Sequence, residues 1–321
     1  MYRKILPWLI GALPVILFFV CCSTAPDDEP ENIPLDGRGG GIIVYCYQPS
    51  TGGINQIYGI NADGTGDRKL IDAPIGLNHH DVSPDGQKVV AVGYVDQATW
   101  SIHVFNFDGS GLTRLTATAN VLDSEPAWSP DGSRIAFTRI YPDQNFRNEI
   151  WIMDADGSNL QRTGIEGYGA RWSLDGTRFI FTNTGNWGAS GLKGSDIYTS
   201  RIDGSDIRQL SSTAGDEWYA SWSADGSRIV FSYTVDGIYA HNEIYAMNAD
   251  GTGRSQLTSN TVCDDGPRWS PDGSRIAFIS DLAAAEQWEV YIMNADGGNV
   301  RRVTNSPSGS TAINPAWVPG F

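Results

Sequence analysis

Short strand-like segments recur along the chain, each shortly after the same five-residue turn. They begin with arginine and continue with β-branched, small and aromatic apolar residues, at 134–137, 178–181, 228–231 and 275–278. The turn has the pattern Trp-Ser-x-Asp-Gly and ends at Gly132, Gly176, Gly226 and Gly273. Apolar runs flanking an Asp-Gly turn are typical of a β-hairpin. We therefore expect two antiparallel strands per repeat, the first of which carries the Trp.

A second Asp-Gly turn closes another hairpin later in each repeat. Its aspartates, 45 to 48 residues apart, are Asp63, Asp108, Asp156, Asp203, Asp250 and Asp296. A period of 40 to 50 residues with strand-like content is typical of a β-propeller, with one four-stranded blade per repeat. The recurring Trp is expected to pack between neighbouring blades.

The two ends of the repeat region complement each other. Residues 42–48, 56–61 and 68–71 supply three strands without a Trp strand before them, whereas residues 314–318 supply a Trp strand alone. Joined, they complete one blade, and such closure removes exposed sheet edges. The sequence therefore predicts an all-β, six-bladed propeller of four-stranded antiparallel blades over residues 42–321, closed by pairing of N- and C-terminal strands.

The repeated Trp-Ser-Pro-Asp-Gly and Met-Asn/Asp-Ala-Asp-Gly blocks resemble the WD40-like repeat of the TolB family over roughly residues 42–319. The resemblance implies a non-catalytic propeller that binds a partner in the cell envelope; TolB itself binds a peptidoglycan-associated lipoprotein. TolB also carries an N-terminal α/β domain, which we expect this chain to lack. A protein or glycan partner, captured by a monomeric propeller, is the favoured interpretation.

The N-terminal segment has the character of an export signal. Arg3 and Lys4 precede an apolar run that ends at Cys21 and Cys22, too short to span a membrane as a stable helix. The cysteine resembles the lipidation site of bacterial lipoproteins, so we expect a signal peptide at 1–21, lipidation of Cys22, and a flexible tether at 22–41. The chain would then lie on the periplasmic side of the outer membrane or on the cell surface. An ordinary cleaved signal, or cleavage before Cys21, is the alternative.

Charge and composition limit the classes of partner that the chain can bind. The chain of 321 residues has a net charge of −15 and a pI of about 4.5. Such a protein is repelled by phosphate backbones and anionic lipids, so we expect no nucleic-acid partner and membrane contact through the lipid anchor only. The two further cysteines, Cys46 and Cys263, are expected to be unpaired.

No catalytic motif accompanies the repeats. The Gly-x-Ser-x-Gly elbow, phosphate-binding loops, Cys-x-x-Cys pairs and His-Glu-x-x-His helices do not occur in the sequence. Asp-Gly turns such as Asp154 to Gly157 lack the spaced ligands of a calcium loop. The sequence therefore favours a protein that is not an enzyme and needs no cofactor.

In propellers of this family, the loops before the innermost strands share one face and ring the mouth of the central channel. By this resemblance, the ligand-binding candidates are Asn78, His79, His80, Asp123, Glu125, Tyr168, Asp216, Glu217, Trp218, Asp264, Asp265 and Asn314. Aromatic residues of other loops, Trp187, Tyr239 and Trp288 among them, are expected on the same face. Acidic and aromatic side chains at a concave mouth suit a glycan or a basic peptide. For any one of these residues, the simpler interpretation is a loop side chain that is merely exposed to water.

A metal-dependent enzyme is the alternative function. Propeller lyases that act on uronate sugars hold a divalent metal with several histidines in the channel. Only His79, His80 and His241 could converge here, with oxygen ligands such as Asp123 or Asp265. A structural histidine pair is the favoured interpretation of His79 and His80.

Overall fold

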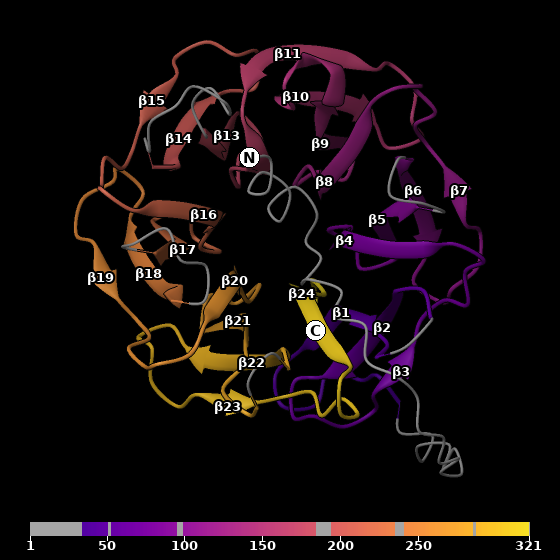
Figure 1. Ribbon diagram of the computed structural model, residues 1–321, viewed down its shortest axis with the longest axis vertical. Helices are drawn as coiled ribbons and strands as arrows, with labels where there is room; N and C mark the ends of the chain where they lie inside the picture. Colours follow the sequence, from indigo (N-terminus) through magenta and orange to yellow (C-terminus); the bar gives the residue numbers. More distant parts are fainter. Residues whose placement is uncertain are drawn as a thin grey trace, which may run out of the picture.

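Six four-stranded antiparallel sheets surround a common centre in the computed structural model (Figure 1). The structure describes residues 34–50, 53–94, 99–183, 194–234, 241–284 and 287–320. Each sheet is one blade, and each is built from strands joined by the two kinds of Asp-Gly turn. The six-bladed all-β fold predicted from the repeats is confirmed.

Each blade runs from an innermost strand at the centre to a short outermost strand at the rim. Given in that order, the blades are β4 (Gly76–Val82), β5 (Lys88–Tyr94), β6 (Trp100–Asn106), β7 (Thr113–Arg114); β8 (Leu122–Trp128), β9 (Arg134–Tyr141), β10 (Arg147–Asp154), β11 (Gln161–Glu166); β12 (Tyr168–Trp172), β13 (Arg178–Asn183), β14 (Asp196–Arg201), β15 (Arg208–Gln209); β16 (Asp216–Trp222), β17 (Arg228–Thr234), β18 (Glu243–Asn248), β19 (Ser255–Gln256); β20 (Asp264–Trp269), β21 (Arg275–Ser280), β22 (Glu289–Asn294), β23 (Arg301–Arg302); and β24 (Thr311–Trp317), β1 (Ile42–Gln48), β2 (Gln56–Asn61), β3 (Arg68–Lys69). A 3₁₀ turn, η1 (Pro142–Gln144), follows β9.

The sixth blade is assembled from both ends of the repeat region. Strand β24 pairs antiparallel with β1, with Trp317 opposite Ile43 and Thr311 opposite Gln48. The neighbouring label positions of β24 and β1 in Figure 1 show the same arrangement. The predicted closure is confirmed, and it pairs the edge of β1 that would otherwise be open.

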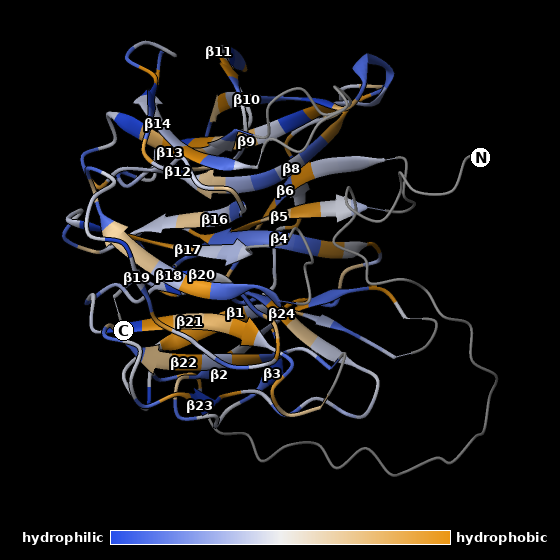
Figure 2. Cartoon of the chain, turned by 60° about the vertical axis from the view of Figure 1, so that its left-hand side comes forward, coloured by the Kyte–Doolittle hydropathy of each residue, from blue (hydrophilic) through white to orange (hydrophobic). Residues whose placement is uncertain are grey.

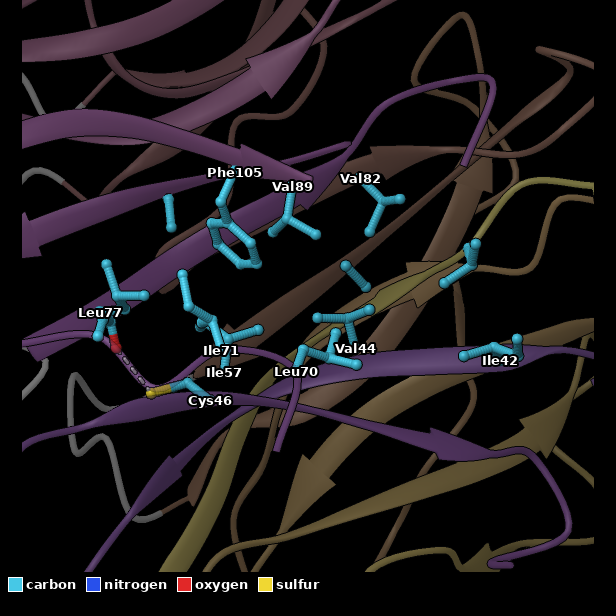
Figure 3. Close-up of a cluster of buried hydrophobic side chains, with 14 residues drawn as sticks. Ile42, Val44, Cys46, Ile57, Leu70, Ile71, Leu77, Val82, Val89 and Phe105 are labelled. Atoms are coloured by element: carbon cyan, nitrogen blue, oxygen red, sulfur yellow. Dashed lines mark hydrogen bonds between the residues drawn. The ribbon is translucent and has the colours of Figure 1, made fainter. Parts of the chain in front are cut away.

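The core lies between blades. Val44 and Ile57 of one blade pack against Val89 and Phe105 of the next, together with Leu70 (Figure 3). Figure 2 shows the corresponding apolar stretches along strands such as β5 and β21. A propeller blade therefore buries its apolar surface only when its neighbours are present.

The repeated tryptophans join neighbouring blades, as predicted. The Trp172 indole N–H donates to the carbonyl of Ala127 at 3.1 Å, and the Trp317 indole donates to the carbonyl of Arg268 at 3.2 Å. In both pairs the acceptor lies on the innermost strand of the preceding blade. The Trp thus contributes buried apolar surface and, in these two blades, a directional bond across the blade boundary.

Residues 34–41, which the sequence assigns to a flexible tether, lie against the sixth blade. Leu35 packs beside Leu70, and the Asn61 side chain accepts hydrogen bonds from the backbone of Asp36 and Gly37 at 3.1 and 3.0 Å. The same side chain donates to the Pro34 carbonyl at 2.9 Å. Hydrogen bonds and the Leu35 contact hold this stretch beside the turn that contains Asp63, whose backbone N–H donates to the Arg38 carbonyl. The predicted signal peptide, Cys22 and the rest of the predicted tether lie outside the described residues.

Candidate functional site

All six innermost strands share an irregularity three residues before their final residue. At this position the backbone has a positive φ, between 36° and 65°, in His79, Glu125, Gly169, Tyr219, Gly266 and Asn314. The pairing register with the next strand shifts there in every blade. This is a β-bulge, which changes the direction of the side chains around it. We call these six positions the bulge ring.

The bulge ring has a conformational cost. Only two of its members are glycine, and a residue with a side chain at positive φ costs of order 1 kcal/mol or more. His79, Glu125 and Tyr219 are large side chains that adopt this conformation. Such strain persists where the surrounding structure over-determines it, and it is frequent at functional sites.

Hydrogen bonds link the innermost strands around one side of the ring. Asn314 of β24 donates to Asn78 of β4 at 2.7 Å, and His79 of β4 lies 2.5 Å from Glu125 of β8. The other oxygen of Glu125 accepts a hydrogen bond from Arg171 of β12 at 3.1 Å. Four blades are therefore joined through polar side chains at the centre of the molecule.

Glu125 is the hub of this network. It is 3 % exposed, and the Tyr168 hydroxyl adds a third contact at 3.3 Å. Burial disfavours the charged carboxylate, but His79, Arg171 and Arg268 together outweigh burial and hold the pKa of Glu125 well below its usual range. The carboxylate is thus ionised and fully engaged by its neighbours at neutral pH.

Charged residues also occupy the position just before the last residue of three innermost strands: Asp81 of β4, Arg171 of β12 and Arg268 of β20. Asp81 accepts a hydrogen bond from the backbone N–H of Trp128 at 2.8 Å. Burial raises the pKa of Asp81, although Arg171 and this N–H favour its charged form. Burial, followed by the proximity of Arg171, lowers the pKa of Arg268 to about 9.

Two tyrosines and an aspartate also lie at this centre. Tyr219 of β16 lies near Asp265 of β20, and burial followed by this carboxylate raises the pKa of Tyr219 well above its usual value. Tyr168 also has a pKa well above the usual range, because of burial and then Glu125. Both hydroxyls remain protonated at neutral pH, so each can donate a hydrogen bond.

Two of the predicted mouth residues point away from the centre. Asp123 forms two hydrogen bonds with Arg139 of β9, at 2.7 and 2.9 Å, and is 1 % exposed. Glu217 is fully buried and accepts a hydrogen bond from Arg254, next to the outermost strand, at 2.6 Å. Burial raises the pKa of Glu217 despite this arginine. Their side chains therefore stabilise their own blades.

The other predicted mouth residues lie in different environments. Asp216 accepts a hydrogen bond from the Ser195 N–H at 2.7 Å, and Asp264 accepts one from Asn260 at 2.7 Å. Trp218 is partly exposed, and Asp265 is buried beside the ring. Among the loop aromatics, Trp288 is buried in the core between two blades, whereas Trp187 and Tyr239 lie outside the described residues.

His80 is separated from the network that holds His79. It is 4 % exposed, neither ring nitrogen makes a well-formed hydrogen bond, and burial lowers its pKa to about 4. The two histidines do not share a ligand. Within the described ranges, no group of three or more His, Cys, Asp or Glu side chains is placed to hold a metal ion.

Sequence reasoning placed Asp81 and Tyr219 with the mouth residues but missed two others of the centre, Arg171 and Arg268. The two arginines stand within the innermost strands, not in the loops before them. Their place directly before the repeated Trp is the sequence signal that identifies them. The positive φ of the bulge ring is not visible in the sequence.

Comparison with known proteins agrees with this architecture. The model of the TolB β-propeller domain family matches residues 55–218 and 187–320, so the chain belongs to this family. A 119-residue stretch, 36% of this chain, is 31% identical to the Tol-Pal system protein TolB of Anaeromyxobacter dehalogenans strain 2CP-C, of which it covers 25%. The chain thus matches about a quarter of that relative's length.

Solved structures support the fold. TolB from Acinetobacter baumannii superimposes with a TM-score of 0.72 at 20% identity, covering 87% of this chain and 67% of that chain. An oligogalacturonate lyase in complex with manganese is more distant, with a TM-score of 0.58 at 15% identity, 83% of this chain and 76% of that chain. In the part of the chain that the structure describes, no helix is long and apolar enough to cross a membrane.

Proposed function

We propose that this chain is a non-catalytic binding propeller of the bacterial cell envelope, which recognises a protein or glycan partner at the centre of the ring. The observation that carries the proposal is the bulge ring, where all six blades present an irregular innermost strand and four are linked through polar side chains. A strained, polar, multi-blade surface suits recognition more than packing. Membership of the TolB propeller family supports a partner in the envelope.

The metal-dependent lyase is not favoured. The described residues hold no metal-ligating cluster, and His79 is engaged by Glu125 instead of by a shared ion site. Likeness to the manganese-bound lyase is a likeness of fold. Binding without chemistry is therefore the function that the arrangement supports best.

Site-specific crosslinking in living cells tests the binding face. A photoreactive residue at Trp218, partly exposed beside the ring, should capture a partner. The matched control is Leu174, which is 62% exposed in an Asp-Gly turn on the opposite side. Adducts formed from Leu174 and not from Trp218 would mean that the partner binds on the face of the Asp-Gly turns, and the proposed binding face would be wrong.

Attachment to the membrane is proposed through Cys22. A labelled fatty acid should be incorporated into the wild-type protein and lost in Cys22→Ala, while Cys21→Ala should remain labelled. This expectation rests on the apolar run before the cysteine pair. Labelling that persists in Cys22→Ala would remove this cysteine as the anchor.

A further inference from the structure

The guanidinium of Arg268 has no hydrogen-bond acceptor and no carboxylate within ion-pair distance among the described residues. The Trp317 indole donates to the backbone carbonyl of Arg268 and does not engage its side chain. The residue keeps part of its surface exposed. A guanidinium carries five N–H donors, and a charge withdrawn from water without a partner is costly. This side chain therefore has donor capacity that the protein itself does not use.

Arg268 lies at the centre of the ring. It interacts electrostatically with Asp81 of β4, Glu125 of β8, Arg171 of β12 and Tyr219 of β16. Only a side chain directed inward can approach the innermost strands of four other blades, which surround the middle of the molecule in Figure 1. The unused donors of Arg268 therefore face the middle of the ring, as does the guanidinium of Arg171 at the same position of β12.

The anionic groups nearest to Arg268 already have partners. Glu125 is held by His79 and Arg171, and Asp81 accepts the Trp128 N–H. Arg171 directs one nitrogen to Glu125 and the other to backbone carbonyls at 3.2 and 3.5 Å. Neither Glu125 nor Asp81 forms an ion pair with the Arg268 guanidinium, and a ligand that brings an acceptor would satisfy it.

We propose that Arg268 receives one carboxylate, from an Asp or Glu side chain on an otherwise uncharged protein segment that enters the channel. The planar guanidinium matches a carboxylate with two parallel hydrogen bonds. A single charge is favoured over a polyuronate, because Asp81 and Glu125 line the same space and the chain carries −15 overall. This inference rests on the proposed binding function and specifies the chemistry of the partner.

The probe is the peptide acetyl-Gly-Glu-Gly-amide, titrated into the full chain and followed by saturation-transfer NMR and calorimetry. Its Gln counterpart lacks the charge, and trigalacturonate supplies the polyuronate. The Glu peptide should bind, and the Gln peptide should not. Arg268→Gln should weaken binding of the Glu peptide by about tenfold or more, the scale of a charge-assisted hydrogen bond.

Two further variants test the sign of the ligand's charge. Asp81→Asn keeps an acceptor for the Trp128 N–H but removes a negative charge near Arg268, so it should tighten binding of the Glu peptide. Arg208→Gln removes an arginine whose side chain is 66% exposed at the rim, and should change nothing. If Arg268→Gln does not fold, as melting curves would show, Asp81→Asn still reports the sign of the ligand charge.

The inference is overturned if the Glu peptide does not bind, if Arg268→Gln or Asp81→Asn binds it as the wild type does, or if trigalacturonate binds more tightly. These failures are distinct from failure of the binding function. A partner crosslinked at Trp218 and captured equally by Arg268→Gln would keep the function and reject the carboxylate. Peptide binding that depends on Arg268, without any crosslinked partner, would support the carboxylate and reject the proposed function.

Discussion

At the scale of single residues, His80 makes stability depend on pH. Burial lowers its pKa from 6.5 to about 4. Between these pH values, His80 binds a proton in the unfolded chain but not in the folded protein. The contribution of neutral His80 to the free energy of unfolding is fully present above pH 6.5. It falls as the pH drops toward 4, by about 3 kcal/mol in all. His80→Leu should remove most of this slope in urea unfolding measured from pH 7 to 4.5. An unchanged slope would mean that His80 is protonated in the native protein.

Glu217, which the sequence places among the mouth candidates, stabilises its own blade. It is fully buried and bonded to Arg254, whose guanidinium also lies 3.9 Å from the Tyr233 ring centroid. Glu217→Ala leaves this arginine without its carboxylate and should cost about 2 kcal/mol in unfolding free energy. The control Glu166→Ala removes a side chain that is 61% exposed and should stay within about 0.5 kcal/mol. Equal stability of the two variants would contradict the assigned role.

At the scale of elements, glycine has two different purposes in this fold. In the bulge ring, Gly266 has φ 62° and nothing within 4 Å of an added Cβ, whereas the turn residue Gly204 has φ 80° and an added Cβ would lie 2.6 Å from the Thr163 carbonyl oxygen of the preceding blade. Gly266→Ala therefore meets backbone strain alone and should cost about 1 kcal/mol. Gly204→Ala adds a clash between blades and should cost clearly more in denaturant unfolding. Similar losses would mean that the turn does not pack as described.

The close approach at Gly204 recurs around the molecule. The glycine of each second Asp-Gly turn, from Gly64 to Gly297, has a backbone carbonyl of the preceding blade as the nearest neighbour of an added Cβ. The sequence explains these glycines by turn geometry alone. Only the assembled ring shows that the same residues also set the spacing between blades.

At the scale of the whole molecule, closure joins the two ends of the repeat region in one blade. Trp317 is 6% exposed and lies between the last and the split blade. Trp317→Ala should cost about 3–5 kcal/mol, the usual loss for a buried aromatic side chain. Leu174→Ala, at a residue 62% exposed, is the control and should be nearly neutral.

Removal of the closing strand tests the ring more severely. A chain that ends before Thr311 lacks β24 and leaves the β1 edge unpaired. We expect aggregation or a large fall in melting temperature, measured by light scattering and circular dichroism. A truncated chain that melts within a few degrees of the full one would show that the blades do not need closure.

The sequence by itself determined the number of blades, both kinds of turn and the split blade, because these follow from local patterns that repeat every 45 to 48 residues. Which side chains meet at the centre was decided only by the tertiary structure. A bulge in each innermost strand, with positive φ at residues as different as His79 and Tyr219, redirects the strand in a way that residue identity does not encode. Closure of the ring then brings Arg171 and Arg268 together across the channel, while Glu217 is drawn outward into its own blade. Convergence of this kind depends on contacts between distant blades, and no local pattern carries that information.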